Sequence, residues 1–267
     1  MKGSTTPFTA IVLAGQRPGK DPVAEAAGVV CKSFAPIGDR PMVHRVLDTL
    51  AAARQIGPRI LCGPSQSMIE QEPGLKARIE RGEVKWIANH STPSLSTYHA
   101  LQSVPHGRPV LVTTADHALL TAEIVDYFCA EARRIGGDVV IGLTLYEGVV
   151  SAFPGTKRTG IKFKDGVYCG CNLFAFLNPR AHRAARFWRQ IEQERKKPLK
   201  MMRTLGWWTV LRYLMGRISL DDGLEGISRK LQIRARAVML PFPQAAVDVD
   251  TADDWQFVQN LVKKQAF

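Results

Sequence analysis

The chain has 267 residues, 45% of them hydrophobic, which suits one large α/β domain, with or without an insertion, better than two equal domains. Its 36 Lys and Arg against 24 Asp and Glu give a formal net charge of +12, so we expect anionic partners such as nucleotides, phosphorylated acceptors, anionic lipid or nucleic acid. Because no apolar run approaches the ~18 residues of a membrane span and the first residues lack a signal-type apolar stretch, we expect a cytoplasmic protein.

Short apolar runs alternate with segments of helical periodicity in the first half of the chain. The pattern predicts strands at 9–13, 59–62, 85–88, 109–113 and 138–143, and helices at 41–54, 94–103 and 121–135. This alternation is typical of right-handed crossovers, so we expect an α/β fold with a Rossmann-like, mainly parallel sheet and helices on both faces. Ligands bind such sheets beyond the carboxyl ends of the strands, where Gly15 and Asp116 fall.

The second half departs from this alternation. It predicts strands at 160–164, 168–176, 233–240 and 245–249, and a last helix at 252–263. The first two strands flank the turn Lys164-Asp165-Gly166, which indicates a small antiparallel excursion. Between about 179 and 231 the chain is expected to be helical and is rich in basic residues.

The first expected strand runs into a loop rich in glycine, proline and lysine. Glycine allows close backbone approach and the cations lie beside backbone amides, which are the parts needed to cradle a triphosphate. A flexible turn without a ligand explains the same composition equally well, and the loop matches neither a Walker A loop nor GxGxxG. The candidate nucleotide-binding residues here are Leu13, Ala14, Gly15, Arg17 and Lys20.

A second motif follows in Cys31-Lys32 and in Gly38-Asp39-Arg40-Pro41-Met42. With Leu13-Ala14-Gly15 it resembles the nucleotidyltransferase superfamily of MobA-like NTP transferases, which includes molybdenum-cofactor guanylyltransferase and the sugar-phosphate and methylerythritol-phosphate nucleotidylyltransferases. Members carry LAAG, a Gly and Arg loop, a Pro-Lys pair and Gly-(Lys or Arg)-Pro-Met at a helix start. Here LAAG is shortened, Cys31 replaces the proline, and the loop before Lys32 is longer.

The resemblance implies roles for residues of these motifs. Lys32 would be a catalytic charge clamp on the phosphates, with Arg17 beside it, whereas the alternative for Lys32 is a solvated surface lysine. The segment from Ser94 to Leu101 resembles the family's base-reading helix start, which makes Ser94, Ser96 and Thr97 candidate base contacts. An N-cap role for one of the three is an equally good explanation, and the base stays open.

Two acidic segments resemble the metal-binding segments of the family. Asp116 follows the apolar run PVLVT, and Asp250 lies in Asp248-Val249-Asp250-Thr251, which is similar to the family's Asp-hydrophobic-Asp-Thr. The resemblance implies that Asp116 and Asp250 bind Mg²⁺, which takes one or two carboxylates plus substrate phosphate oxygens. Asp248 shares one side of an extended segment with Asp250 and is the reserve candidate, while the alternative for Asp250 is a helix N-cap.

The acceptor is expected over the antiparallel excursion. Lys157, Arg158 and Lys162 are the cations there that would meet an anionic group, and Lys162 is our candidate contact. The segment Tyr168-Cys169-Gly170-Cys171-Asn172 resembles the family's acceptor strand, which makes Asn172 the second acceptor-binding candidate.

A basic, aromatic helical insertion occupies about 187–231. One interpretation places it on an anionic membrane, covering a lipid-linked acceptor, which would make the protein peripheral at the inner membrane face. The other makes it a packed helical subdomain, which we favour because most amphipathic helices pack. We expect no nucleic-acid partner because no binding motif accompanies the charge.

These features predict a single nucleotidyltransferase domain over 1–267, with a nucleotide-binding half at 1–150 and an acceptor-binding half at 151–267. It would move a nucleoside monophosphate from a triphosphate to a phosphate-bearing acceptor, small or lipid-linked, with Mg²⁺ as cofactor and release of pyrophosphate. A glycosyltransferase of related fold and a non-catalytic nucleotide-binding protein are the alternatives, although the former normally carries Asp-x-Asp after its central strand. The sequence does not predict an oligomeric state.

Overall fold

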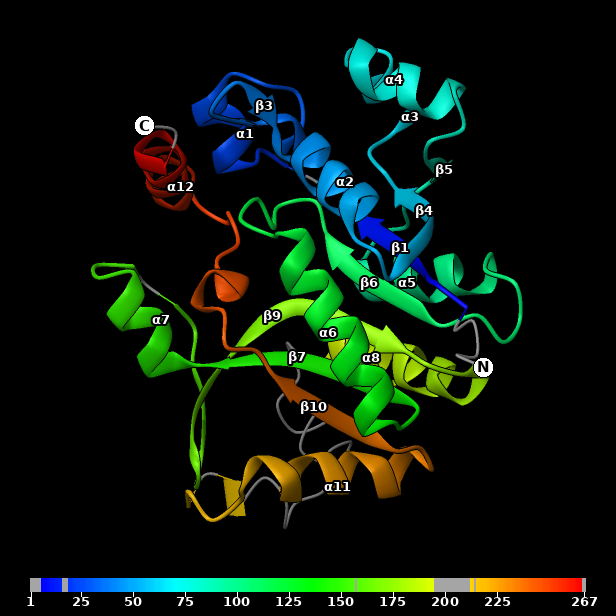
Figure 1. The fold of residues 1–267 in the computed structure, drawn as a ribbon, viewed down its shortest axis with the longest axis vertical. Helices are drawn as coiled ribbons and strands as arrows, with labels where there is room; N and C mark the ends of the chain where they lie inside the picture. Colours follow the sequence, from blue (N-terminus) through cyan, green and yellow to red (C-terminus); the bar gives the residue numbers. More distant parts are fainter. Residues whose placement is uncertain (1–5, 16–18, 157, 195–211, 214, 266–267) are drawn as a thin grey trace.

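A computed structural model describes the fold of residues 6–15, 19–156, 158–194, 212–213 and 215–265. Eight strands form one sheet in the order β10-β7-β9-β6-β1-β4-β5, with β8 paired to β9, and β2 and β3 form a separate small antiparallel pair. Within this sheet β9 alone runs antiparallel to its neighbours β6, β7 and β8, whereas the other described strand pairs are parallel, and helices cover both faces (Figure 1). The predicted Rossmann-like, mainly parallel α/β fold is therefore confirmed.

The strands have the following bounds: β1 (Phe8–Leu13), β2 (Pro36–Ile37), β3 (Arg40–Pro41), β4 (Ile56–Cys62), β5 (Lys85–Ile87), β6 (Val110–Thr114), β7 (Val139–Leu145), β8 (Ile161–Phe163), β9 (Gly166–Phe176) and β10 (Ala235–Met239). The α-helices are α1 (Pro22–Ala27), α2 (Met42–Ala52), α3 (Gln66–Ile69), α4 (Pro73–Glu80), α5 (Pro93–Gln102), α6 (Ala122–Ile135), α7 (Tyr146–Ala152), α8 (His182–Glu194), α11 (Leu220–Leu231) and α12 (Ala252–Gln265). Three short 3₁₀ helices are η1 (Lys32–Phe34), η2 (Pro179–Ala181) and η3 (Pro243–Ala246).

Side chains that alternate along β1 enter two different cores. Ala10 and Val12 join the core beneath α2 and α6, whereas Ile11 joins the core beneath α5, α8 and α11. Successive residues of a strand point to opposite faces, so a strand covered on both faces needs apolar residues at every position. This is why the uninterrupted apolar run of the sequence correctly predicts a central strand.

The antiparallel excursion is confirmed, but it extends farther into the fold than expected. β8 and β9 pair around the predicted turn, and β9 then continues between β6 and β7 as a member of the main sheet. The register of β9 against β7 shifts between Ile141 and Leu143, which marks a bulge. Asn172 lies in the bulged stretch with φ of 48°, a conformation that non-glycine residues seldom adopt.

The strand predicted at 245–249 is wrong. Pro243 opens the helix η3, and the residues that follow have no ladder partner in the described part of the chain. Proline has a fixed φ and no N–H to donate, which favours a helical turn at this point. The Val249 N–H instead donates to the carbonyl of Asp116 at 3.1 Å, so this apolar segment is held against the end of β6.

The helices of the basic region that the structure describes are packed. Ala185 of α8 and Leu220 and Leu224 of α11 are buried in the core on one face of the sheet. The Trp188 ring of α8 stacks on the Phe174 ring of β9, with 5.7 Å between the ring centroids. This supports the packed interpretation for α8 and α11, while residues 195–211 of the insertion lie outside the described residues. In the described part of the chain, no helix has the length and apolar character needed to cross a bilayer.

Phe128→Ala tests the packing of α6 on the sheet. Phe128 is 0% exposed and belongs to the same buried cluster as Val140 of β7, so loss of the ring should lower the free energy of unfolding by about 3–5 kcal/mol through the cavity it leaves. Tyr127, the preceding residue, is 37% exposed, and Tyr127→Ala should cost clearly less. Urea unfolding of both variants measures the difference, and equal losses would contradict the described packing.

Candidate active site

A cleft of about 600 Å³ opens at the carboxyl ends of β1, β4 and β6. This is the edge at which open α/β sheets bind ligands. The residues that line it are Leu13, Gly15, Lys20, Asp21, Pro22, Lys32, Cys62, Asn89, His90, Ser91, Thr92, Pro93, Ser96, Val112, Thr113, Thr114, Asp116, Asn172, Phe174, Trp188, Asp248 and Asp250.

Three charged residues from distant parts of the chain meet in this cleft. Lys32 is the first residue of η1, Asp116 follows β6, and Asp250 precedes α12. The Lys32 Nζ donates to Asp116 Oδ2 at 2.7 Å and to Asp250 Oδ1 at 2.7 Å. The structure thus brings together the charge clamp and both acids that the sequence motifs single out.

Burial and charge act in opposite directions on the Lys32 ammonium. Removal from water favours the neutral amine, but the nearby carboxylates of Asp116 and Asp250 and the hydrogen bonds to them outweigh this and raise the lysine pKa above its ordinary value. The side chains of Lys32 and Asp116 are 19% and 20% exposed, whereas that of Asp250 is 66% exposed. The Lys32 side chain therefore carries a positive charge into the cleft.

Backbone hydrogen bonds hold Asp116 in place. The Ala115 N–H donates to the carbonyl of Leu13 at 2.9 Å, which continues the β1–β6 pairing, and the Asp116 carbonyl accepts from Val249. One carboxylate oxygen, Asp116 Oδ1, is buried and has no hydrogen-bond partner in the described part of the chain. A buried acceptor without a partner is costly unless a ligand supplies one.

The donor set of the cleft fits a divalent cation that also binds substrate. The described residues hold no group of three or more His, Cys, Asp or Glu side chains suited to a metal ion. Mg²⁺ needs only one or two carboxylates when phosphate oxygens complete its shell, and it prefers hard oxygen ligands. The unpartnered oxygen of Asp116 and the exposed carboxylate of Asp250 meet this requirement.

Arg158 holds the segment that carries Asp250. Its guanidinium donates to the carbonyl of Asp248 at 3.0 Å, to Asp248 Oδ1 at 3.1 Å and to Asp254 Oδ1 at 2.9 Å. Asp254 and Thr251 form reciprocal side-chain to backbone hydrogen bonds at the start of α12. Thr251 is thus the capping residue, which leaves the Asp250 side chain free to face the cleft.

Asp248 and Asn172 meet at the side of the cleft formed by β9. The Asn172 Nδ2 donates to Asp248 Oδ2 at 2.9 Å, and both residues line the cleft. Burial, with the charges of Asp250 and Asp116, raises the pKa of Asp248 to about 6, against the opposing effects of Arg158 and Asn172. The left-handed backbone at Asn172 is a strained position that directs an amide toward this group.

The first loop also contributes to the cleft, and residues 16–18 of it lie outside the described residues. Leu13, Gly15 and Lys20 line the cleft, whereas Ala14 is buried and does not, and Arg17 lies outside the described residues. A Cβ added at Gly63, where φ is +78°, would lie 3.0 Å from the Gly15 backbone, so glycine permits this close approach.

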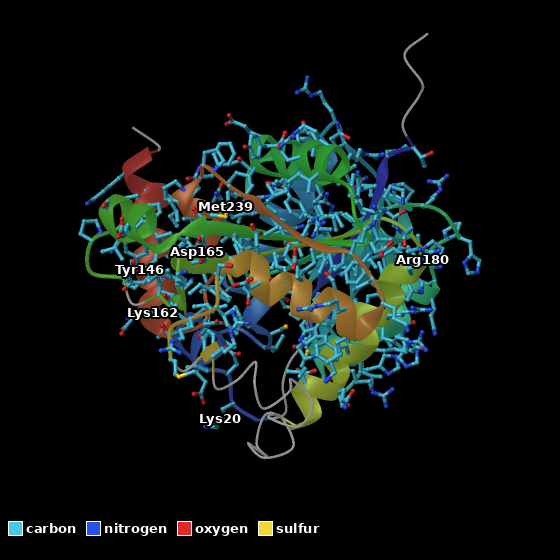
Figure 2. The ribbon with its side chains drawn as sticks, turned by 90° about the horizontal axis from the view of Figure 1, so that it is seen from below. Lys20, Tyr146, Lys162, Asp165, Arg180 and Met239 are labelled. Carbon is cyan, nitrogen blue, oxygen red and sulfur yellow. The ribbon has the colours of Figure 1, made fainter. Side chains whose placement is uncertain are left out.

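The two exposed lysines among the candidates differ in their position. The Lys20 side chain is 89% exposed and pairs with Glu25 at 3.1 Å at the mouth of the cleft. Lys162 is exposed on β8 and does not line the cleft, and the neighbouring Lys157 lies outside the described residues. Figure 2 shows Lys20 and Lys162 at separate places on the surface.

The three hydroxyl candidates of α5 have different surroundings. Only Ser96 lines the cleft, where its Oγ accepts from the His90 N–H at 2.8 Å. Ser94 donates to Glu192 of α8, and Thr97 Oγ1 donates to the carbonyl of Pro93 at 2.9 Å, so neither is directed into the cleft. None of the three is the N-cap, because Thr92 accepts from the Leu95 N–H.

Several cleft residues were missed by the motif analysis. They are Asp21, Asn89, His90, Thr92, Phe174 and Trp188. Asp21 caps α1, a short helix in a segment that the sequence pattern predicts as loop. Thr92 could have been predicted as the N-cap of α5, because it directly precedes Pro93, the first residue of that helix. Phe174 and Trp188 come together through tertiary packing and carry no local signal.

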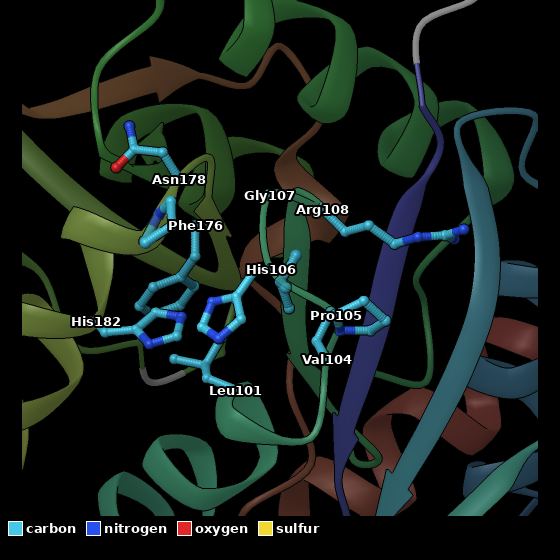
Figure 3. A pocket seen from close by; sticks show the side chains of 11 residues that line it. Leu101, Val104, Pro105, His106, Gly107, Arg108, Phe176, Asn178 and His182 are labelled. Carbon is cyan, nitrogen blue, oxygen red and sulfur yellow. The ribbon is translucent and has the colours of Figure 1, made fainter.

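A second, small cavity lies at the other end of β6. Figure 3 shows the rings of His106 and His182 beside Leu101 and Phe176. The space measures about 10 Å³, which is room for about one water molecule. It is too small to bind a substrate, unlike the larger cleft.

Arg158→Met tests the hold on the Asp250 segment. The Arg158 side chain is 6% exposed, so its removal leaves Asp248 and Asp254 without their cation and should lower the free energy of unfolding by about 3 kcal/mol. The matched control is Arg134→Met, which breaks an exposed pair with Glu131 and should cost far less. Chemical denaturation measures both, and a mild effect of Arg158→Met would contradict the assigned role.

The chain was also compared with known proteins. The MobA-like NTP transferase domain family matches residues 10–157, more than half of the chain. No protein of curated function matches significantly. Among solved structures, a hypothetical transferase from Thermus thermophilus is 30% identical, with a TM-score of 0.77 over 93% of this chain and 99% of that one.

Two further solved structures share the fold. One is 4-diphosphocytidyl-2C-methyl-D-erythritol synthase from Anaerococcus prevotii, with 16% identity and a TM-score of 0.56 over 97% of this chain and 96% of that one. The other is CMP:2-keto-3-deoxy-manno-octonic acid synthetase complexed with CTP, with 12% identity and a TM-score of 0.56 over 97% of this chain and 99% of that one. The likeness at these identities concerns the fold alone. The family match includes most of β1, Lys32 and Asp116, and by this match the chain belongs to the MobA-like NTP transferase domain family of nucleotidyltransferase enzymes.

Proposed function

We propose that the enzyme transfers a nucleoside monophosphate from a nucleoside triphosphate to a phosphate-bearing acceptor and releases pyrophosphate, with Mg²⁺ as cofactor. The observation that carries this proposal is the Lys32 ammonium between Asp116 and Asp250, 2.7 Å from each, in a cleft at the carboxyl edge of the sheet. The ammonium can neutralise phosphate charge, and the two acids can bind the Mg²⁺ that accompanies a triphosphate.

The reaction would be an in-line displacement at the α-phosphorus. An acceptor phosphate oxygen forms the new P–O bond while the bond to the β-phosphate breaks, and pyrophosphate takes the electron pair. Lys32 would follow the charge onto the leaving pyrophosphate because its ammonium is carried on a flexible chain. A bound Mg²⁺ on Asp116 and Asp250 would offset negative charge on the phosphate oxygens.

The walls of the cleft suggest where each substrate lies. We assign the triphosphate and its base to residues 1–150, near Gly15, Lys20 and Ser96, and the acceptor to residues 151–267, near Asn172. Arg17 is proposed as a further phosphate contact by its place in the motif. Lys162 lies outside the cleft and would contact only an acceptor that extends toward β8.

The family assignment favours nucleotidyl transfer over the glycosyl transfer that a related fold would allow. A nucleoside triphosphate as substrate suits a cytoplasmic location. A lipid-linked acceptor, with peripheral contact at the inner membrane face, remains an alternative to a small one and concerns mainly the residues of the insertion that lie outside the described range.

Asp116→Asn tests the proposed reaction. Purified protein with Mg²⁺, each of the four triphosphates in turn and a pool of phosphorylated metabolites should release pyrophosphate, and the substitution should lower the rate at least about 100-fold because a charged cation ligand is lost. The control Asp253→Asn removes an exposed acid three residues beyond Asp250 and should leave the rate unchanged. Turnover by Asp116→Asn near the wild-type rate would remove Asp116 from the mechanism.

Ser96→Ala and Thr97→Val test the assignment of the base-binding wall. Ser96 positions the His90 loop in the cleft, so its loss should raise KM for the triphosphate about fivefold with little change in kcat. The Thr97 hydroxyl bonds within its own helix, and Thr97→Val should leave KM within about twofold. A larger KM effect from Thr97 than from Ser96 would place the base elsewhere. Steady-state kinetics with the active triphosphate gives both constants.

A further inference from the structure

The Lys32 ammonium occupies the space between the two acids proposed to bind the divalent cation. It accepts no hydrogen bond and donates one to each acid, using Oδ2 of Asp116 and Oδ1 of Asp250. In the described part of the chain these are the only ion pairs that either acid forms. Lys32 therefore pairs with one oxygen of each acid, while Asp116 Oδ1 has no partner in the described part of the chain.

A divalent cation and this ammonium would compete for the same negative charge. Both are positive, and two cations that share the same carboxylates repel strongly where little water screens them. Lys32 and Asp116 are about four-fifths buried, with side chains 19% and 20% exposed, so screening is weak. A cation on Asp116 Oδ1 would share that carboxylate with the ammonium, so we expect its binding to be weak until Lys32 moves away from the acids.

We propose that Lys32 is an internal competitor of the divalent cation, which holds the Asp116 and Asp250 pair in the nucleotide-free protein and releases it when triphosphate oxygens accept its ammonium. The inference rests on the proposed function, which assigns the acid pair to the cation and the cleft to the triphosphate. It implies that cation and nucleotide bind cooperatively, since each favours the position of Lys32 that the other needs, and such coupling is reciprocal.

The cleft contains a matched lysine for a control. Lys20 lines the same cleft, but its ammonium pairs with Glu25 at 3.1 Å and contacts neither Asp116 nor Asp250. Lys20→Met and Lys32→Met change the net charge equally, whereas only Lys32→Met empties the space between the acids. A difference in cation affinity between the two variants is therefore due to the contacts of Lys32 with the two acids and not to the overall charge of the protein.

Mn²⁺ binding without nucleotide, followed by electron paramagnetic resonance of the free ion, tests the proposal. Lys32→Met should bind Mn²⁺ about tenfold more tightly than wild type because the acids lose their competing cation. Lys32→Arg, which keeps the charge, and Lys20→Met should stay within about twofold of wild type. Lys32→Met combined with Asp116→Asn should lose the gain.

Thermal unfolding with and without Mn²⁺ provides a second readout. A cation that binds the folded state raises its melting temperature, so Mn²⁺ should stabilise Lys32→Met more than wild type. If repulsion between the acids impairs folding of Lys32→Met, Lys32→Gln removes the charge but keeps an amide donor for them. Unchanged or weaker Mn²⁺ binding in the neutral variants, or an equal gain in Lys20→Met, would overturn the proposal.

The outcome is separable from the proposed function. If no triphosphate supports pyrophosphate release while Lys32→Met gains Mn²⁺ affinity, the competition stands and the proposed reaction fails. If pyrophosphate release depends on Mg²⁺ and on Asp116 while the neutral variants bind Mn²⁺ like wild type, the proposed reaction stands and the competition fails.

Discussion

The ion bridge from Lys32 to Asp116 and Asp250 is the interaction on which the site depends. It joins η1, the end of β6 and the segment before α12, which are separated by 84 and 218 positions along the chain from Lys32. Bringing charges out of water is costly, and an ion pair often gains little net stability from it. The bridge therefore serves mainly to set position, because it joins three segments from distant parts of the chain at one point on the edge of the sheet.

The surrounding structure supports this arrangement from the C-terminal side. Arg158 contacts Asp248 and Asp254 and so holds both ends of the short segment that carries Asp250. Asn172, in a bulge of β9, contacts Asp248 from the sheet. Binding groups placed on loops need a rigid scaffold to keep their geometry, and here a buried guanidinium and a strained strand residue provide it.

Helix α8 links the two halves of the molecule. Its Glu192 accepts hydrogen bonds from the backbone and side chain of Ser94 at the start of α5, and its Trp188 stacks on Phe174 of β9. The carboxylate lies at the amino end of α5, where the helix dipole favours negative charge. A helix from the C-terminal half thus closes one wall of the cleft and holds the segment proposed to face the base.

Local pattern determined most of the elements and the charged motifs. Burial on one or both faces leaves a periodicity in the sequence, so the apolar strands, the helices and the acidic turn at Asp116 were predictable, whereas the resemblance to the nucleotidyltransferase superfamily singled out Lys32 and Asp250. Tertiary structure alone decided that β9 enters the main sheet, that Ser94 turns toward α8 rather than the cleft, and that Phe174 and Trp188 form a wall. These outcomes depend on contacts between residues far apart along the chain, and such contacts leave no periodic trace in either partner's neighbourhood.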